Sequence, residues 1–462
     1  MTDFSSLLQP DKGQPATPLI LADKNGFNEW LKGQPERIRQ AVSAQNFKAE
    51  GDQIAILPGE KSEWSAVLGV ANVEELSPWC LAKAADTLPE GSYRVDGRSP
   101  GTAMLGWLLG QYRFDRYKQQ ASATGPRVLL TTDAARIEEI EALARATALV
   151  RDLVNTPAQD LGPGELEAAI SEVANSFSAT VSGTSGRELE SGYPMIHAVG
   201  RAASPDRKPR LVELEWGDPK HPRIAIVGKG VCFDSGGLDI KNASGMRVMK
   251  KDMGGAAHAL GLAFLVMNSR LPVRLHLLIP AVENAISGSA FRPGDVLTSR
   301  KGLTVEVGNT DAEGRLILAD ALTRAAEGNP ELILDFATLT GAARVALGPD
   351  LPALFASDDA LADALLGGGE AVSDPLWRMP LWKHYADMLS SDIADIGNVS
   401  GQPMAGAVTA ALFLQKFVPD GLPWAHFDTF AWRSSAKPGR PKGGDALGLR
   451  AAWHMLKLRY GG

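Results

Sequence analysis

The sequence predicts an α/β protein. A small N-terminal α/β domain is joined by a long helix to a larger C-terminal domain with a mixed sheet covered by helices on both faces. Three observations favour this fold. The chain has 462 residues, 44% of them hydrophobic and 22% charged, which suits a globular protein of more than one domain. An amphipathic stretch occupies residues 133–155. Beyond it, apolar runs of strand length alternate with helical patterns.

The first third of the chain mixes strand-like and helix-like segments. Residues 52–59 and 64–70 flank the turn-prone sequence PGEK and predict a pair of strands. Two further short runs, 92–97 and 127–132, also predict strands. Residues 100–118 predict one helix, opened by a Pro-Gly pair. We find no chemistry-bearing motif in this part.

The stretch 133–155 predicts a long helix that connects the two domains. Pro157 ends it, because proline cannot continue a helix. Thr147 and Arg151 interrupt its apolar stripe. We place the boundary inside this helix, with a small N-terminal domain over residues 1–150 and a larger C-terminal domain over 151–462. The apolar stripe consists of Ile137, Ile140, Leu143, Ala144, Ala148 and Val154.

The remainder predicts a sheet buried on both faces. Continuous apolar runs at 222–230, 273–282 and 331–341 have strand length, and helical patterns at 253–269 and 315–328 lie between them. In such sheets, functional sites form at the carboxyl ends of the strands. The loops after these strands are therefore the places to search.

Composition narrows the function classes. The net charge is −7 and no block of Lys or Arg appears, so nucleic acid is not predicted as a partner. No apolar run reaches the ~20 residues of a membrane span, and no signal peptide is evident. The two cysteines, Cys80 and Cys232, are far apart, which argues against a disulfide framework. We expect a cytoplasmic protein without a membrane partner.

Three loop segments carry clustered charges. In VGNTDAEGRL, acids and a guanidinium stand at every second position, which is the spacing of an extended chain whose side chains point the same way. The other segments are VGKGVCFDSGG and LDIKNASGMRVMKKDMGG. Together the three supply four carboxylates, two lysines and one arginine: Asp234, Asp252, Asp311, Glu313, Lys229, Lys241 and Arg315.

Close carboxylates repel one another unless a proton or a cation lies between them. Four acids and only seven scattered histidines favour two oxygen-bound metal ions bridged by carboxylates, which would activate a shared water for hydrolysis. Each residue also has a plain structural interpretation. Asp252 would cap the following helix, Arg315 would pair with a neighbouring acid, and Cys232 would be a small buried hydrophobe. Asp311 and Glu313 would be acids of a first helical turn, favoured there by the helix dipole, and both lysines would be solvated.

The same segments resemble a known family. NTDAEGRL is similar to the signature of the leucyl aminopeptidase (cytosol aminopeptidase) family, and VGKGVCFDSGGLDIK and MKKDMGGAA are similar to its other two site segments. RDLVNTPAQDLGP, AVENAISGSAFRPGD and DFATLTGAA follow the family in the same order. The resemblance covers residues 145–430, with seven charged positions that agree in type, order and spacing.

The resemblance implies removal of the N-terminal residue, leucine or another bulky apolar residue, from peptides with a free N-terminus. Two divalent ions, Mn²⁺ or Zn²⁺, would activate the water, with Asp234 and Glu313 bridging them. Lys241 would stabilise the oxyanion, and Arg315 would hold a bicarbonate ion as general base. The resemblance also implies a homohexamer. The implied metal ligands are Lys229, Asp234, Asp252, Asp311 and Glu313, and the implied substrate-binding residues are Met249, Thr338, Leu339 and Gly341.

The chain departs from the family near its C-terminus, where HFDTFAW at residues 426–432 is shorter than the family segment. The preference for leucine depends on this region. Two rival functions stay open on the residues alone. A metal-free hydrolase with an acid pair would survive chelation, and a non-catalytic assembly or nucleic-acid-binding protein would show no turnover. A nucleotide-binding function lacks both glycine-rich motifs that it would need.

Overall fold

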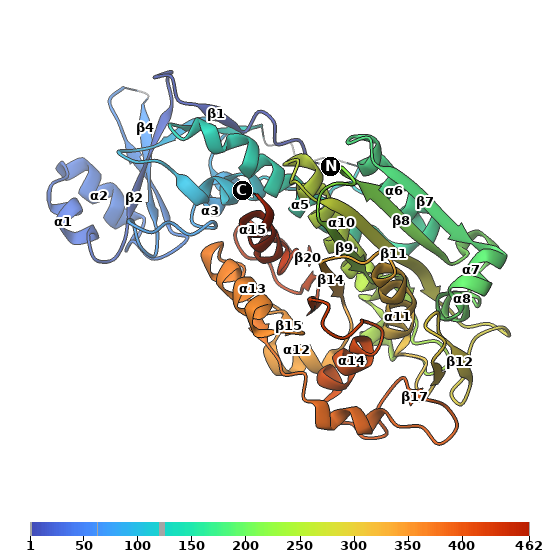
Figure 1. The fold of residues 1–462 in the computed structure, drawn as a ribbon. Helices are drawn as coiled ribbons and strands as arrows, with labels where there is room; N and C mark the ends of the chain where they lie inside the picture. The colour runs from blue at the N-terminus through green and yellow to red at the C-terminus, as the bar shows by residue number, and fades with distance from the viewer. Residues whose placement is uncertain (1, 62, 120–124, 462) are drawn as a thin grey trace. The chain divides into compact units, whose positions relative to one another are not determined.

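The computed structural model describes residues 2–61, 63–119 and 125–461 (Figure 1). It divides into two compact units, described here one at a time. The first comprises Met1–Ala148 and Ser434–Lys442, and the second comprises Leu149–Arg433 and Gly443–Gly462. Residues 434–442 therefore belong with the first unit although they lie near the end of the chain, which their sequence does not signal.

The first unit is built on a six-stranded sheet in the order β1-β6-β5-β2-β4-β3. Its strands run parallel except for β3, which pairs antiparallel with β4, so the predicted strand pair is confirmed. The strands are β1 Leu8–Pro10, β2 Thr17–Ala22, β3 Ile54–Pro58, β4 Trp64–Gly69, β5 Gly91–Val95 and β6 Arg127–Thr131. The helices are α1 Phe27–Lys32, α2 Glu36–Ala44, α3 Ala82–Thr87 and α4 Met104–Leu109.

The helix predicted over residues 100–118 is much shorter in the structure. A 3₁₀ turn at Gly101–Ala103 leads into α4, which ends at Leu109. Beyond it, the Gln111 side chain donates to the Arg127 carbonyl (2.9 Å) and accepts from the Arg127 amide (3.0 Å). These hydrogen bonds attach the chain to the start of β6, so tertiary contacts override the helical pattern.

Helix α5, Ile137–Asn155, confirms the predicted long helix and ends before Pro157. The two polar residues within its apolar stripe are buried, and each has a partner. The Thr147 hydroxyl donates to the Leu143 carbonyl at 2.8 Å. Arg151 Nη2 lies 3.0 Å from Asp445 Oδ1, with the arginine fully buried. The stripe therefore continues through these positions because each polar side chain reaches a partner inside the protein.

The second unit contains a mixed sheet in the order β16-β15-β18-β14-β9-β11-β8-β7, with β10 added beside β11. Strands β18, β14, β9 and β11 run parallel to one another. Strand β15 pairs antiparallel with β18, β8 with β11, and β7 with β8. The predicted mixed sheet is confirmed. Its strands are β7 Thr180–Ser185, β8 Arg210–Trp216, β9 Arg223–Gly228, β10 Gly230–Asp234, β11 Arg274–Asn284, β14 Leu332–Ala337, β15 Ala353–Ala356, β16 Trp377–Arg378 and β18 Trp424–Asp428.

Helices cover both faces of this sheet, and strand β9 shows why. Ala225 and Val227 pack in one core cluster with apolar residues of α11. Gly228 faces the opposite side, where an added Cβ would lie 2.7 Å from Ala259 Cβ on α10. The helices are α6 Pro163–Asn175, α7 Gly186–Gly192, α8 Pro194–Gly200, α9 Ala243–Met246, α10 Gly254–Asn268, α11 Glu313–Ala326, α12 Gly341–Leu347, α13 Asp359–Ala371, α14 Gly406–Gln415 and α15 Leu449–Tyr460.

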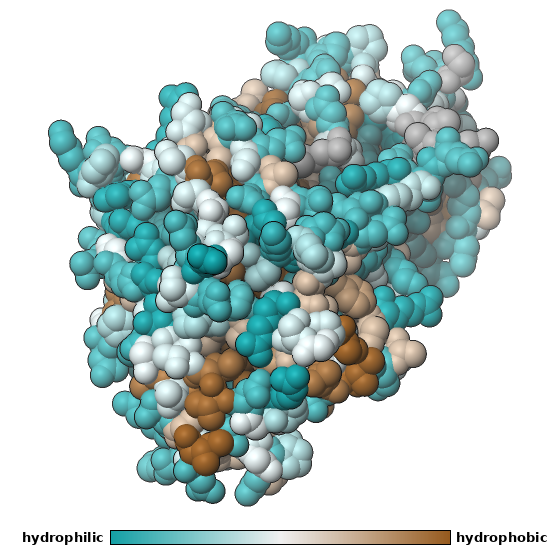
Figure 2. Space-filling model, turned by 90° about the vertical axis from the view of Figure 1, so that its right-hand side faces the viewer, coloured by the Kyte–Doolittle hydropathy of each residue, from teal (hydrophilic) through white to brown (hydrophobic). Residues whose placement is uncertain are grey.

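Two small sheets complete the second unit. Strands β12 Val296–Thr298, β13 Thr304–Glu306 and β17 Ile396–Gly397 form one, and β19 Trp432–Arg433 with β20 Gly443–Gly444 form the other. The face shown in Figure 2 is mostly hydrophilic, with hydrophobic residues gathered in its lower part. In the described part of the chain, no helix has the length and apolar character needed to cross a membrane.

Candidate metal centre

Lys229 lies at the junction between β9 and β10. Its amide donates to the Phe336 carbonyl at the end of β14, and its carbonyl accepts from the Ala256 amide on α10. The glycine on each side is tightly packed. A Cβ at Gly228 would meet Ala256 Cα at 2.6 Å, and one at Gly230 would meet the Pro280 carbonyl at 2.6 Å. Close packing of this segment against α10 and β11 thus places Lys229 at the carboxyl ends of the parallel strands.

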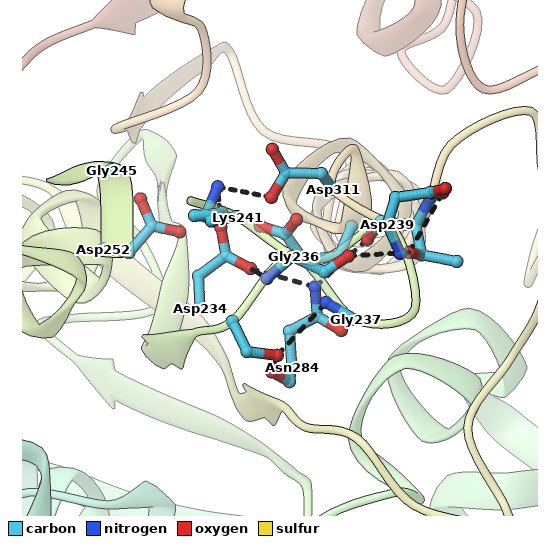
Figure 3. A network of polar contacts seen from close by, with 12 residues as sticks. Asp234, Gly236, Gly237, Asp239, Lys241, Gly245, Asp252, Asn284 and Asp311 are labelled. Atoms are coloured by element: carbon cyan, nitrogen blue, oxygen red, sulfur yellow. Dashed lines mark hydrogen bonds and ion pairs between the residues drawn. The ribbon is translucent and has the colours of Figure 1, made fainter. Parts of the chain in front are cut away.

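Asp234 ends β10, and a β-bulge sets its direction. The register with β11 shifts between Val231 and Phe233, so Cys232 is the extra residue and Asp234 stands opposite Asn284. Asn284 Nδ2 donates to Asp234 Oδ1 at 2.9 Å, and the Gly236 amide donates to the same oxygen at 2.9 Å (Figure 3). Cys232 itself is buried, as its structural interpretation predicts, and burial raises the pKa of its thiol.

Asp252 lies in a 3₁₀ turn, Met249–Met253, just before α10. The capping residue of α10 is Met253, without a side-chain cap, so the interpretation of Asp252 as a helix cap is wrong. Instead Asp252 Oδ1 accepts from Thr338 Oγ1 at 2.8 Å, and Oδ2 lies 2.7 Å from Lys229 Nζ. Its carboxylate therefore points to the carboxyl end of β14.

The segment that contains Asp311, Glu313 and Arg315 differs from the extended chain that its spacing suggests. Helix α11 begins at Glu313, so the last two residues lie in a helical first turn. Both are buried, Glu313 at 1% and Arg315 at 8% exposure, and neither is solvated. Arg315 Nη1 donates to the Asn398 carbonyl at 2.6 Å. Across the described chain, Arg315 forms no ion pair with Asp311 or Glu313, so that interpretation is also wrong.

The three loops nevertheless converge. Carboxylate oxygens of Asp234, Asp252 and Glu313 lie within 4.8 Å of one another, and all three residues are buried. Burial, together with the nearby Asp234, raises the pKa of Glu313 to about 8. Burial and Asp234 also raise the pKa of the Asp311 carboxyl. Without a cation, the buried site therefore does not stabilise all of these carboxylates in their ionised form.

Both predicted lysines reach into this cluster rather than into solvent. Lys229 Nζ lies 2.7 Å from Asp252 Oδ2 and 3.0 Å from Glu313 Oε1. Lys241 Nζ lies 2.7 Å from Asp234 Oδ2 and also pairs with Asp311 (Figure 3). Burial alone would lower the pKa of each lysine, but the surrounding carboxylates outweigh it and raise the pKa of both.

The donor set fits divalent cations. It consists mainly of carboxylate oxygens, and among the described residues the buried Glu313 Oε2 has no hydrogen-bond partner. A dication in the cluster would favour ionised carboxylates and a neutral amine on Lys229. In the same described set, the buried Arg315 Nε also lacks a partner, which leaves part of its planar fork for an anion.

Hydrogen bonds between Thr310 and the segment 236–239 hold two of the loops together, and the sequence does not signal them. Thr310 donates from its amide to Asp239 Oδ2 at 2.8 Å and from its hydroxyl to the Gly236 carbonyl at 2.6 Å. The Asp239 amide donates back to the Thr310 hydroxyl at 2.9 Å (Figure 3). The turn requires glycine, because Gly236 and Gly237 have φ of +89° and +66°.

The predicted substrate turn, Thr338–Gly341, links β14 to α12 beside Asp252. Sequence reasoning missed the residue that shapes it. Asp428, at the end of β18, accepts from the Leu339 and Thr340 amides at 3.1 and 3.2 Å and from the Thr340 hydroxyl. Its place in HFDTFAW, at the carboxyl end of a strand, is the signal that could have found it. Met249 is buried in the 3₁₀ turn that carries Asp252.

A second group of side chains, with Lys251 in direct contact with Asp252, lies next to the cluster. Lys251 Nζ lies 3.0 Å from Asp252 Oδ1 and 5.6 Å from the centre of the Phe430 ring. The guanidinium of Arg344 lies over the same ring, with Cζ 4.7 Å from its centre. Burial lowers the pKa of Lys251 to about 8, Asp252 opposes this, and the positive charge of Arg344 adds to it. Phe430 belongs to the short segment that departs from the family pattern.

Comparisons with known proteins agree on one family. The family model described as "Cytosol aminopeptidase family, catalytic domain" matches residues 148–452, and "M17 aminopeptidase, N-terminal domain" matches residues 17–130. A probable cytosol aminopeptidase of Syntrophotalea carbinolica is 42% identical over 369 residues, which is 76% of this chain and 73% of the relative.

Solved structures are similar over nearly the whole chain. The cytosol aminopeptidase of Coxiella burnetii is 46% identical, with a TM-score of 0.93 over 98% of this chain and 99% of that one. The bottromycin maturation enzyme BotP, solved in complex with Mn, is 32% identical, with a TM-score of 0.86 over 96% of this chain and 99% of that one.

Proposed function

The chain belongs to the cytosol aminopeptidase family of M17 metallo-aminopeptidases, and we propose that it removes leucine or another bulky apolar residue from the free N-terminus of peptides. One observation above all supports a two-metal hydrolysis. It is the buried cluster in which carboxylates of Asp234, Asp252 and Glu313 lie within 4.8 Å of one another, with two lysines at its margin.

The proposed metals are two divalent ions, Mn²⁺ or Zn²⁺. Asp234 and Glu313 would bridge them, Asp311 would complete one site, and Lys229 with Asp252 would complete the other. When bound, the ions lower the pKa of a shared water, polarise the scissile carbonyl and hold the substrate's α-amine. The Mn-bound relative and the unpartnered Glu313 Oε2 among the described residues support this assignment.

Two cationic side chains have separate proposed roles. Lys241 keeps its charge beside Asp234, so its ammonium is suited to stabilise the oxyanion that develops on the scissile carbonyl. Arg315 Nη1 donates to the Asn398 carbonyl, and the buried Nε of the same guanidinium has no hydrogen-bond partner among the described residues. We assign it a bicarbonate ion, which would accept the proton of the attacking water.

Substrate binding is assigned to Met249 and to Thr338, Leu339 and Gly341. The Asp428 carboxylate accepts hydrogen bonds from two amides of this turn, which fixes the backbone of the turn in place for pairing with a peptide. A methionine in the pocket for the first side chain favours bulky apolar residues, because its thioether adapts to their shape. The Phe430 segment borders the same region, so the detailed preference depends on it.

The assembly, location and domain division are also proposals. Large apolar side chains are exposed on the described surface, among them Ile240 at 60% and Ile393 at 63%, which suits contact with other subunits, and the homohexamer is the assembly that the family resemblance implies. Relatives are named cytosol aminopeptidases, which supports a cytoplasmic location. The two family models, at 17–130 and 148–452, support domains over residues 1–150 and 151–462.

The test is release of leucine from leucine amide after dialysis against EDTA, and again after addition of Mn²⁺. We expect turnover to disappear and then return, while the melting transition shows that the dialysed protein stays folded. Turnover that persists after complete metal removal would contradict the proposal and favour a metal-free acid pair. Absence of turnover with Mn²⁺ on a panel of N-terminal residues would also contradict it.

A further inference from the structure

Arg344 lies in α12, the short helix that follows the proposed substrate turn. Its guanidinium stacks on Phe430, with Cζ 4.7 Å from the ring centre. It also lies close to the turn itself, because a Cβ built on Gly341 would be 3.4 Å from Arg344 Nη2. The aromatic ring therefore supports one face of the guanidinium plane beside the place where we expect the peptide backbone.

Among the described residues, no acidic side chain pairs with the charge of Arg344. Throughout the described residues, no carboxylate lies within 4.0 Å of its nitrogens, and its N–H groups make no hydrogen bond. Other arginines of this unit differ, since Arg300 pairs with Glu327 and Arg433 pairs with Asp445. A guanidinium has five N–H donors that point outward in its plane, and an aromatic ring stacked on its face leaves these donors available for hydrogen bonds.

Contacts connect Arg344 to the metal cluster in short steps. Arg344 and Lys251 both lie against the Phe430 ring, at 4.7 Å and 5.6 Å from its centre, and Lys251 Nζ also lies 3.0 Å from Asp252 Oδ1. Lys251 is thus engaged by a proposed metal ligand, whereas Arg344 is not. One extended residue spans about 3.5 Å. A peptide held at the cluster would bring the residue after the scissile bond toward Arg344.

We propose that Arg344 binds a carboxylate on the residue that follows the scissile bond, an inference that rests on the aminopeptidase function proposed above. Two sources supply this group: the C-terminal carboxylate of a dipeptide, or the side chain of Asp or Glu in a longer peptide. The planar fork matches a carboxylate with two parallel hydrogen bonds, and stacking on Phe430 orients it in advance.

The experiment compares kcat/KM for two pairs of substrates that differ only in charge. The first pair is Leu-Gly and Leu-Gly amide, and the second is Leu-Asp amide and Leu-Asn amide. Each is measured with the Mn²⁺-loaded wild type, with Arg344→Met, and with Arg378→Met as a matched control. Arg378 is an arginine of the same unit that pairs with Asp359 on the surface.

We expect the wild type to prefer the charged member of at least one pair by roughly tenfold, as a charge-assisted hydrogen bond allows. Arg344→Met should bring that ratio close to one, and Arg378→Met should leave it unchanged. Preference within the first pair identifies the dipeptide terminus, and preference within the second identifies the acidic side chain. Arg344→Lys, which keeps the charge without the fork, should retain part of the preference.

Ratios near one for both pairs in the wild type would overturn the proposal. A preference that survives Arg344→Met would overturn it as well. Loss of packing alone would slow all four substrates alike and leave the ratios as they are, so a purely structural role gives a different result. Failure of the aminopeptidase function is seen separately, as absence of leucine amide turnover by the wild type with Mn²⁺.

Discussion

Gly314 and the side chain of Lys229 fill one narrow space. A Cβ at position 314 would lie 2.6 Å from Lys229 Cε and 2.7 Å from Nζ. The glycine stands between the proposed ligand Glu313 and the buried Arg315, in the first turn of α11. Its lack of a side chain thus lets an amine from a distant loop reach the carboxylates.

Gly314→Ala tests this relationship. Alanine favours a helix by about 0.5–1 kcal/mol over glycine, which offsets part of the cost of moving the buried amine, so the variant should stay folded. The new methyl group should push the Lys229 amine away from Asp252 and Glu313, so kcat should fall. Thermal unfolding and steady-state kinetics on the same preparation check both effects. Full activity in a well-folded variant would show that Lys229 need not occupy its observed position.

Glu313→Ala should abolish turnover with little loss of fold, because it removes a bridging ligand. Loss of metal activation corresponds to several kcal/mol of barrier, or at least about a 10³-fold fall in kcat. Glu313→Gln, which keeps the shape, should be equally inactive. Calorimetric Mn²⁺ titration and unfolding curves separate the loss of metal from loss of fold. Activity close to that of the wild type in either variant would contradict the two-metal assignment.

Thr310→Val should weaken Mn²⁺ binding while the protein stays folded. The valine keeps the shape of threonine but loses the hydroxyl that joins the Gly236 carbonyl to the Asp239 amide. Groups that orient metal ligands typically change affinity by about 10–100-fold. Titration with Mn²⁺ measures the change. Thr323→Val is the control, since the Thr323 hydroxyl donates to the Ala319 carbonyl within α11, and the Mn²⁺ affinity of this variant should match the wild type.

Asp320 predicts a pH dependence of stability in the second unit. Its buried carboxylate accepts from the Met195 and Ile196 amides at the start of α8 and from the Arg300 amide. Burial raises its pKa to about 7, and these hydrogen bonds oppose the rise only in part. In the unfolded chain the pKa of an Asp is about 3.9. The folded state therefore binds the proton more tightly.

The sign follows from that difference. The contribution of Asp320 to the free energy of unfolding is fully present below pH 4 and is lost as the pH rises toward 7, by up to about 1.4 kcal/mol per pH unit. Asp320→Asn carries no proton to lose. Denaturant unfolding of both proteins from pH 4 to 8 should show the wild type losing stability relative to the variant. A difference that does not change with pH would refute the raised pKa.

Much of the fold follows from local sequence. Strands such as Arg223–Gly228 and Leu332–Ala337 are recognisable from continuous apolar runs, because each is buried on both faces. The charged residues of the site are recognisable for a related reason. Lys229, for example, follows directly after the first of these runs, at the edge where the ends of parallel strands meet, and a lysine is otherwise costly to bury there.

Other features could not be read from any local pattern. The bulge at Cys232 turns Asp234 toward Asn284, and α11 begins at Glu313 although the spacing suggests extended chain. Asp428 shapes the substrate turn from a position about ninety residues further along the chain. Each depends on register or hydrogen bonds between segments far apart in sequence.

By itself, then, the sequence determined the long connecting helix and the buried strands of the larger sheet, the charged residues that carry the chemistry, and the family to which the chain belongs. Periodicity reports whether a side chain is buried, and residue type reports which chemistry it offers. Only the tertiary structure decided where those side chains point, that Lys229 passes over Gly314, and that Arg344 lies on Phe430 without a carboxylate partner among the described residues. The physical reason is that packing against the rest of the fold sets where a side chain points and which group it pairs with. A short stretch of sequence contains only one of the two partners in each such contact.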